Sequence, residues 1–363
     1  MRKLCIVLTD PLKICYEKGE IKERYYNPCN YFDEVHVISF CENDIDEDRV
    51  RLIVGGAFLK IYPIGKLTFF SLLLIRRKLL RLVEYIRPDI IRAYDPSLRG
   101  ALAVYIAKKL GLPAVISLHY HPSDQRKFDS RIIIRLRIIL EHYVLKNASK
   151  IICVTNYVKT YAQKYGAKDA VVVYNRVNTE QFRPTKNVLR DEKLILSIGR
   201  FDRQKYQECL IRAIKALDVK LILIGHGKTY PYLKKLCYKL KIEDKVIFVE
   251  RVTNSVIQEY YWKCGIFALA THYEGFCIPI LEAMASGVPV VASDIPPIRE
   301  ISQGAAKLVP NDPAAFRAAF LEIMADKNKK KEMVYNGLEL IKNKFDYYNL
   351  ENAEKKIYES LIL

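Results

Sequence analysis

Short apolar runs and longer amphipathic runs alternate along the whole of this sequence, and this alternation constrains the fold more than any other feature. In the first half, helical patterns occur at roughly 66–86, 97–110, 130–147 and 156–165. Around them, runs rich in β-branched residues predict six buried strands, at 3–9, 34–40, 88–94, 113–119, 150–155 and 170–174. Nearly continuous apolar strands that alternate with helices indicate a parallel sheet covered on both faces.

The pattern then restarts after a polar, Pro-containing segment, 177–193, which we expect to be a linker. Three helical patterns follow Pro313, and strands are predicted before them at 194–199, 220–225, 245–250, 265–270 and 289–293. We therefore expect two doubly wound, Rossmann-like α/β domains, at 1–176 and from 177 onward. Two such domains in tandem leave a cleft at the carboxyl ends of both sheets, where open α/β sheets bind ligands.

The formal charge of +18 is unevenly distributed, because residues 60–150 contain 18 Lys and Arg against 6 Asp and Glu. Such a surplus favours an anionic partner, which is a phosphorylated substrate, an anionic lipid surface or a nucleic acid. Segments 67–83 and 124–147 combine apolar residues at helical spacing with arginines. Two interpretations stay open for them: core-facing helices with cationic outer rows, or helices that lie against an anionic membrane. A heat-adapted composition would explain the basicity without any partner.

Targeting and redox signals are few. The apolar run after Met1 ends at Asp10 and predicts a first strand, and the run at 67–83 is interrupted by arginines well short of the ~20 apolar residues that span a membrane. The nine cysteines include no C-x-x-C pair, so neither a disulfide framework nor a zinc site is indicated. We expect free thiols and a cytoplasmic protein, either free or peripheral on the inner face of the membrane.

Cations and glycines follow two strands of the second domain. After the strand at 194–199, Gly199 permits a tight turn, and Arg200 and Lys205 lie at the entrance to a helix whose free N–H groups also attract anions. The forked donors of arginine and the point charge of lysine suit a diphosphate. Gly225 and His226 form another tight turn after the strand at 220–225. Each signal alone is weak, because most loop cations are solvated.

The segment THYEGFCIPILEA, 271–283, holds two carboxylates, Glu274 and Glu282, between a predicted strand and a helix. We expect the helix to begin near Ile278, with Gly275, Phe276 and Cys277 as its approach and Pro279 in its first turn. Glu282 then also falls in the first turn, where the helix dipole favours an ionised carboxylate. Such a carboxylate can accept two hydrogen bonds from a ribose diol, and Glu274 can reach another part of the same ligand. A nucleoside diphosphate sugar would provide a partner for each of these side chains: phosphates for the cations, and ribose and sugar hydroxyls for the carboxylates.

These motifs, SIGRFDRQK, IGHG, EGFCIPILEAMASGVPVVASD and the preceding VVVYNRVNTEQFRP, resemble the signature of the retaining glycosyltransferases of family four, which have the GT-B fold. A weaker resemblance to the same family extends over RPDIIRAYDPSLRGALAVYIAKKLGLPAVISLHYH in the first domain. The resemblance implies a second domain at 177–344 and a C-terminal helix within 345–363 that returns to the first domain.

The resemblance also assigns roles to individual residues. It implies that Arg200 and Lys205 bind the donor's phosphates next to the 275–277 loop, and that Glu282 binds the ribose. Glu274 would hold sugar hydroxyls near the reacting carbon. His119, at the end of a first-domain strand, would face the donor sugar across the cleft. By position alone, the acceptor side would include Asp95, Tyr120 and Asp124, whereas His121 stays open between a site histidine and a packed one.

The sequence departs from the family pattern at several places. The glycine-rich loop after the first strand is replaced by Gly19 and Glu20 in a longer insertion, which we place on the acceptor side. Cys277 stands where a small residue normally lets the phosphate approach, NRVN (175–178) replaces the usual NGVD, and Tyr206 replaces a common glycine. None of these changes removes a charged group that the chemistry needs.

The expected reaction is transfer of a hexosyl unit from a UDP- or GDP-sugar to an acceptor hydroxyl, with retention implied by the resemblance. The acceptor would be a glycan or a lipid-linked compound. Arg200, Lys205 and the helix N-terminus would stabilise the charge of the leaving diphosphate. No Asp-x-Asp lies in a convincing metal-binding loop, because the acidic run 42–48 is expected to be a solvated turn. We therefore expect no essential metal and no cofactor.

Two other classes remain as alternatives. The first is another GT-B nucleotide-sugar enzyme, of the epimerase or phosphorylase type, which conversion of a nucleotide sugar without any acceptor would favour. The second is a basic nucleic-acid-binding α/β protein, which the charge and the 25 tyrosines would suit. Against the second, no recognised module appears and the cations do not interleave with aromatic residues.

Overall fold

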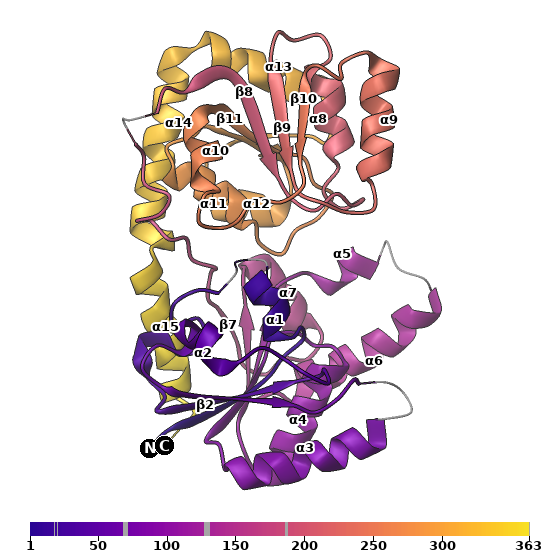
Figure 1. The fold of residues 1–363 in the computed structure, drawn as a ribbon, viewed down its shortest axis with the longest axis vertical. Helices are drawn as coiled ribbons and strands as arrows, with labels where there is room; N and C mark the ends of the chain where they lie inside the picture. The colour runs from indigo at the N-terminus through magenta and orange to yellow at the C-terminus, as the bar shows by residue number, and fades with distance from the viewer. Residues whose placement is uncertain (18, 20, 68–71, 127–130, 186–187, 363) are drawn as a thin grey trace. The chain divides into compact units, whose positions relative to one another are not determined.

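Two compact units make up the chain (Figure 1). The computed structural model describes residues 1–17, 19, 21–67, 72–126, 131–185 and 188–362. Residues 1–174 together with 350–363 form the first unit, and residues 175–349 form the second. The boundaries expected after residues 176 and 344 lie two and five residues from these.

The first unit contains a sheet of seven parallel strands in the order β3-β2-β1-β4-β5-β6-β7. The inner strands consist mostly of buried branched side chains, which a sheet covered on both faces requires. The strands are β1 (Lys3–Val7), β2 (Glu34–Ser39), β3 (Phe58–Pro63), β4 (Ile90–Ala93), β5 (Ala114–Leu118), β6 (Lys150–Cys153) and β7 (Ala170–Val172).

Helices cover both faces of this sheet. In Figure 1, α3 (Leu72–Ile86), α4 (Leu98–Leu110) and α6 (Arg131–Asn147) lie together, and α4 contacts both of the others. The remaining helices of the unit are α1 (Leu12–Glu17), α2 (Glu47–Val50), α5 (Pro122–Arg126), α7 (Asn156–Lys164) and the greater part of α15 (Tyr347–Glu359), with 3-10 turns at Pro28–Asn30 and Arg51–Val54.

The C-terminal segment is part of the first unit's core. Ile357 and Tyr358 of α15 pack in one apolar cluster with residues of β1 and β2. Glu354 of the same helix accepts a 2.9 Å hydrogen bond from Nη2 of Arg92, a β4 side chain that is 2% exposed. Arg92 also donates to Ser117 of β5, at 2.9 Å. A buried cation on the sheet therefore has its carboxylate partner on the last helix of the chain.

The second unit contains six parallel strands in the order β10-β9-β8-β11-β12-β13. As in the first unit, the strand order reverses next to the first strand, which defines a doubly wound sheet. The strands are β8 (Asp191–Ile198), β9 (Lys220–Ile224), β10 (Val246–Val249), β11 (Cys264–Leu269), β12 (Val290–Ser293) and β13 (Lys307–Val309).

Two groups of helices flank this second sheet (Figure 1). One group is α8 (Gln207–Ile214), α9 (Tyr230–Leu240) and α13 (Pro313–Ala325), with α8 in contact with the other two. The other group includes α10 (Gln258–Lys263), α11 (Ile278–Ala285) and α14 (Lys327–Leu340), in which α11 contacts both others. Helix α12 (Pro296–Ser302) joins β12 to β13, and a π-helical turn at Ile341–Phe345 follows α14.

Three local expectations were wrong wholly or in part. Segment 177–193 is not a free linker, because Val177 and Phe182 are buried in the second unit and β8 begins at Asp191. The acidic run 42–48 is only partly a solvated turn: Glu42, Asn43, Asp46 and Asp48 are exposed, but Asp44 accepts hydrogen bonds from the N–H groups of Leu12 and Lys13. Strands β3 and β13 were not predicted, and both are short or partly exposed edge strands. Among the described residues, no helix is long and apolar enough to cross a membrane.

Candidate functional site

The predicted donor residues of the second unit gather at one place on its sheet. Strands β8 and β11 are neighbours, and the order of the sheet reverses between them. Arg200 and Lys205 follow β8, whereas Glu274 and Glu282 follow β11. Ligands of open α/β sheets bind outside the carboxyl ends of the strands at such a reversal. The topology therefore places these side chains where a doubly wound sheet has its binding crevice.

An ion pair between Lys205 and Glu274 lies at the centre of this site. Nζ of Lys205 is 2.6 Å from Oε1 of Glu274, and the two side chains are 13% and 6% exposed. Burial alone would lower the pKa of Lys205, but the adjacent Glu274 carboxylate outweighs it and holds that pKa above its ordinary value. Lys205 therefore stays protonated. Because an ammonium group has three donors, it can hold Glu274 and still donate to an anionic ligand.

Two polar residues that the sequence did not single out complete the surroundings of Glu274. The hydroxyl of Thr271 donates to Oε1 of Glu274 at 2.9 Å. The amide of Gln204 donates to the carbonyl of Tyr273 at 2.8 Å and lies 3.4 Å from Oε2 of Glu274. The position of Gln204 next to Lys205 was the one signal available, since Thr271 is buried. Together they fix the carboxylate and leave acceptor capacity on Oε2.

Arg200 differs from Lys205 in being on the surface. Its side chain is 70% exposed, and Nη2 lies 3.1 Å from Oε1 of Gln204 and 3.5 Å from Oδ2 of Asp202. Gln204 thus contacts Arg200 with its oxygen and the segment of Glu274 with its nitrogen. The two predicted phosphate-binding cations lie in one hydrogen-bonded loop, where Lys205 is nearly buried and Arg200 is largely exposed.

Glycines let the loops after β8 and β9 approach each other closely. Gly225 has a φ of +146°, and a Cβ added to it would lie 2.1 Å from the carbonyl oxygen of Gly199. The N–H of Phe201 donates to the carbonyl of His226 at 2.8 Å, which holds the second loop against the first. A Cβ on Gly199 would lie 3.3 Å from Cδ of Lys205. The predicted turn residues therefore shape the wall around Lys205, and the His226 side chain is exposed.

Helix α11 begins at Ile278 as expected, with Pro279 in its first turn. Glu282 is the fifth residue of this helix and not a member of its first turn, so the dipole argument for its ionisation was wrong. Its carboxylate is instead held by a neighbour from α10, because the buried hydroxyl of Tyr261 donates to Oε2 of Glu282 at 2.8 Å. This hydrogen bond orients the Glu282 carboxylate, and Glu282 is partly exposed.

The approach to α11, residues 275–277, is buried. Cys277 is the N-cap residue, and its side chain caps no backbone N–H of the helix. Burial raises the pKa of the Cys277 thiol to about 12, so that it stays neutral. Phe276 packs with its ring centroid 6.1 Å from that of Phe345, within the same unit. A neutral, apolar residue therefore stands where the family pattern has a small one.

The other predicted residues belong to the first unit. His119 follows β5 and stacks on Tyr94 with ring centroids 6.1 Å apart. Burial and the nearby Arg92 cation lower the pKa of His119 to about 4, which keeps its imidazole neutral. Asp95 is 8% exposed and accepts hydrogen bonds from the Thr9 hydroxyl and the Ser97 N–H. These residues follow β1, β4 and β5, where the first sheet also reverses its order.

The three remaining acceptor-side predictions are dispersed in this unit. Asp124 lies in α5 and accepts a 2.7 Å hydrogen bond from the Tyr157 hydroxyl. Tyr120 directly follows His119 and is half-buried. Gly19 lies in a turn after α1 with a φ of +68°, and not in the loop that directly follows β1. Within the described ranges, no three His, Cys, Asp or Glu side chains lie close enough together to hold a metal ion.

Two family models match the chain, one on each half. Residues 178–340 match "Glycosyl transferases group 1", and residues 33–181 match "Glycosyltransferase Family 4". An uncharacterized glycosyltransferase of Methanocaldococcus jannaschii is 28% identical over 75% of this chain and 76% of its own length. Alpha-monoglucosyldiacylglycerol synthase of Streptococcus pneumoniae is 26% identical over 60% of this chain, which spans only 55% of that enzyme.

Solved structures agree with the sequence comparison. Anabaena HepE, determined in complex with UDP and glucose, superposes with a TM-score of 0.79 over 99% of this chain and 100% of its own, at 18% identity. At that identity the likeness shows the fold, which is GT-B. The two matched segments together reach from residue 33 to residue 340 and contain every cation and carboxylate of the site in the second unit. The chain is therefore a glycosyltransferase of the GT-B fold, whose carboxyl-terminal part matches the group 1 model and whose amino-terminal part matches the family 4 model.

Proposed function

We propose that this glycosyltransferase moves a hexosyl unit from a UDP- or GDP-sugar to an acceptor hydroxyl, with retention and without an essential metal. The observation that carries the donor assignment is the site at the β8/β11 reversal. It combines a buried cation paired with a carboxylate, an exposed arginine and a second carboxylate held by a tyrosine. A nucleoside diphosphate sugar is the ligand that needs all of these groups. The HepE structures with UDP and with UDP-glucose support a nucleotide of this kind.

Each side chain has a separate task in this proposal. Lys205 keeps one donor on Glu274 and turns another to the β-phosphate, and Arg200 closes over the diphosphate from solvent. Both cations stabilise the negative charge that develops on the leaving group as the glycosidic bond breaks. Oε2 of Glu274 accepts a hydrogen bond from a sugar hydroxyl. Glu282, oriented by Tyr261, accepts both hydroxyls of the ribose.

The first experiment is a thermal-shift panel with UDP, GDP and ADP, because a ligand that binds only the folded state raises the melting temperature. One series should give a clear shift, and its 2′-deoxy analogue a smaller one, since the deoxy sugar cannot offer Glu282 a diol. In Glu282→Ala the preference for the ribonucleotide should disappear. If no nucleotide shifts the transition, the donor assignment is wrong. If the preference survives in the variant, the role of Glu282 is wrong.

Retention and metal independence need the reaction itself. Once the base is known, the anomeric configuration of the product follows from the coupling constant of its anomeric proton in NMR. Transfer should continue in EDTA at an unchanged rate. A product with the opposite anomeric configuration to the donor, or a rate restored only by added metal, would contradict the respective part of the proposal.

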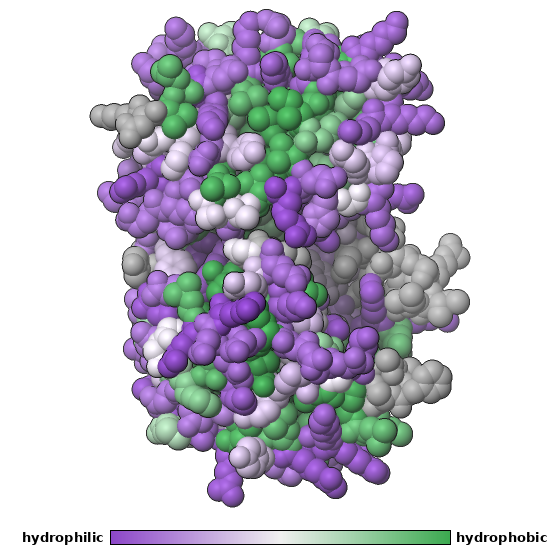
Figure 2. Space-filling view, viewed as in Figure 1, coloured by the Kyte–Doolittle hydropathy of each residue, from purple (hydrophilic) through white to green (hydrophobic). Residues whose placement is uncertain are grey.

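The acceptor is proposed to be a glycan or a lipid-linked compound reached at an anionic membrane surface. Exposed apolar residues lie beside cations on two helices: Leu73 and Leu74 on α3, and Leu136 and Ile139 on α6. In Figure 2, apolar and hydrophilic side chains alternate over the surface where Figure 1 draws α3. Apolar residues edged by arginines suit anionic headgroups. The synthase from Streptococcus pneumoniae, by its name, makes a glycolipid.

Vesicle sedimentation tests this second part. We expect binding to vesicles that contain phosphatidylglycerol, little binding to pure phosphatidylcholine, and weaker binding of Leu73→Ser/Leu74→Ser. The matched control is Tyr238→Ser, at an exposed apolar residue of α9 in the second unit. Equal binding to both kinds of vesicle, or none to either, would contradict a membrane-bound acceptor.

A further inference from the structure

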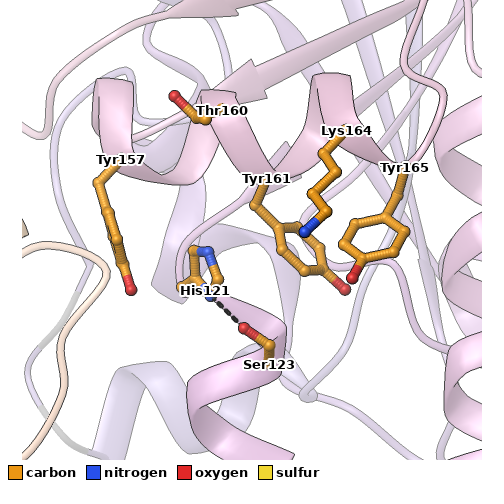
Figure 3. Close-up of a pocket in the computed structure, with 7 residues that line it drawn as sticks. All are labelled: His121, Ser123, Tyr157, Thr160, Tyr161, Lys164 and Tyr165. Atoms are coloured by element: carbon orange, nitrogen blue, oxygen red, sulfur yellow. Dashed lines mark hydrogen bonds between the residues drawn. The ribbon is translucent and has the colours of Figure 1, made fainter.

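A cavity of about 210 Å³ lies in the first unit, outside the carboxyl ends of two adjacent parallel strands (Figure 3). One side of it comes from the segment after β5 and the other from helix α7, which follows β6. Its lining residues are His121, Ser123, Tyr157, Thr160, Tyr161, Lys164 and Tyr165. The carboxyl ends of parallel strands are where open α/β sheets bind ligands, so the cavity is placed as a binding site would be.

Aromatic rings form most of the wall. Tyr157, Tyr161 and Tyr165 are four residues apart along α7 and its C-cap, so they share one face of the helix. His121 stacks on Tyr157 with centroids 4.4 Å apart and meets Tyr161 edge-on at 4.5 Å. The Tyr157 hydroxyl is bound to Asp124. These contacts hold the rings in place.

A cation and hydroxyl groups lie at the same cavity. Lys164 reaches between the rings of Tyr161 and Tyr165, with Nζ 5.7 Å from the centroid of Tyr165 (Figure 3). Lys164 forms no ion pair within the part of the chain that the structure describes. Ser123, whose hydroxyl lies 2.8 Å from Nδ1 of His121, and Thr160 add polar groups. The cavity therefore offers apolar ring surface, hydroxyls and the ammonium of Lys164. The carboxylates of Asp124 and Glu141 lie behind the rings and accept hydrogen bonds from the Tyr157 and Tyr161 hydroxyls.

We propose that this cavity binds one pyranose ring that carries an acidic group, a phosphate or a carboxylate. The C–H bonds on the face of a pyranose carry partial positive charge and pack on the negative face of an aromatic ring, while its hydroxyls need polar partners at the rim. The acidic group meets Lys164. A cavity of this volume lies below the ~300–1,000 Å³ of sites for drug-sized ligands, so one sugar ring fits and a nucleoside diphosphate does not.

The inference rests on the proposed function in one respect only, which is that the bound ring is a unit of the acceptor. In that case the acceptor class narrows to glycans or lipid-linked sugars with an acidic sugar near the reacting hydroxyl. Asp124, predicted from position as an acceptor-side residue, then acts through Tyr157 by fixing that ring. Binding itself requires no donor and no turnover, and it is measured separately from them.

The test is saturation-transfer NMR on the full chain with glucose 6-phosphate, glucuronic acid and glucose as probes. We expect transfer to at least one acidic probe, with a dissociation constant on the order of 1 mM, and weaker transfer to glucose. If only glucose 6-phosphate binds, the acidic group of the ligand is a phosphate. If only glucuronic acid binds, the acidic group is a carboxylate. No transfer to any probe, or equal transfer to glucose and both acids, would overturn the proposal.

Variants locate the binding. Thr160 is exposed on α7, so Thr160→Trp should fill the cavity and remove transfer to all probes while the melting temperature stays unchanged. Lys164→Gln should weaken binding of the acidic probe about fivefold and leave binding of glucose unchanged. Lys168→Gln makes the same charge change at an exposed lysine outside the cavity and should alter nothing. Transfer that persists in Thr160→Trp would overturn the site. The UDP or GDP thermal shift in the same samples reports on the donor site independently, so either proposal can fail without the other.

Discussion

The ammonium of Lys205 lies 2.6 Å from the carboxylate of Glu274, and the pair joins loops that follow two neighbouring strands, β8 and β11. Both side chains are almost buried, so each charge depends on the other for its stability. The pair therefore has a structural role and a functional role, and a substitution of either residue changes both stability and activity. Experiments on this site have to separate the two.

Lys205→Ala should lower both turnover and stability. The alanine leaves the Glu274 carboxylate buried without its cation, which costs about 3 kcal/mol of unfolding free energy. The double variant Lys205→Met/Glu274→Gln removes both charges and should regain most of that stability, without regaining activity. Urea denaturation and a transfer assay on the same samples check this. Full activity in the double variant would show that neither charge takes part in the reaction.

Arg200→Ala should lower kcat/KM by about 10²–10³-fold with almost no change in stability. The side chain is 70% exposed, and an exposed ion pair such as that with Asp202 adds at most about 1 kcal/mol. Arg203→Ala, three residues along the same loop at an exposed side chain, is the matched control and should keep its activity. Similar losses in both variants would indicate a general effect of loop charge and not a specific phosphate contact.

Acid should destabilise the protein partly through His119. Its folded-state pKa of about 4 lies below the ordinary value near 6.5, so the unfolded chain takes up the proton first as the pH falls. The stabilisation is complete above pH ~6.5 and is lost towards pH ~4, with a loss of about 2 kcal/mol between pH 7 and pH 5. His119→Gln should remove this part of the pH dependence in urea titrations. His226→Gln, at an exposed histidine, should leave it as it is in the parent protein.

Gly225→Ala should be far more harmful than Gly199→Ala. The first adds a Cβ that would lie 2.1 Å from a backbone oxygen, at a φ that favours glycine, so the loops after β8 and β9 must separate. We expect a loss of at least about 2 kcal/mol and no nucleotide-induced thermal shift. Gly199→Ala meets only the flexible stem of Lys205 at 3.3 Å. It should fold normally and bind the nucleotide more weakly. Equal stability of the two variants would contradict this account of the turn.

The sequence was sufficient for the strands that are buried on both faces, because an unbroken apolar run such as that of β11 has few alternatives. Two of the four edge strands were missed: β3 alternates exposed and buried residues, and β13 has three residues. Glu282 was placed one turn too early in its helix, although the start at Ile278 was correct. The start of a helix depends on nearby residues such as Pro279, which the sequence shows. The hydrogen-bond partner of a side chain depends on the fold, which brings together residues that are distant in the sequence.

The candidate site shows the same division. Glycines, cations and carboxylates after strands could be recognised from the sequence, because strand ends are where such sheets bind ligands. The pairing of Lys205 with Glu274, 69 residues further along the chain, could not be predicted, because it depends on β8 lying beside β11 in the sheet. The contacts of Gln204 and Thr271 with Glu274 depend on the same neighbouring position of β8 and β11. The retaining outcome and the roles of His119 and Glu274 stay predictions.

The pairing of Arg92 with Glu354 has a consequence for biosynthesis. The two residues are 262 positions apart, and Glu354 lies on the last helix. A ribosome therefore exposes the β4 arginine long before its carboxylate exists, while the second unit, a continuous stretch from 175 to 349, is already complete. Although domains usually fold in the order of their synthesis, here the second unit can finish first. The amino-terminal part of the first unit would then stay partly assembled until α15 has been synthesised.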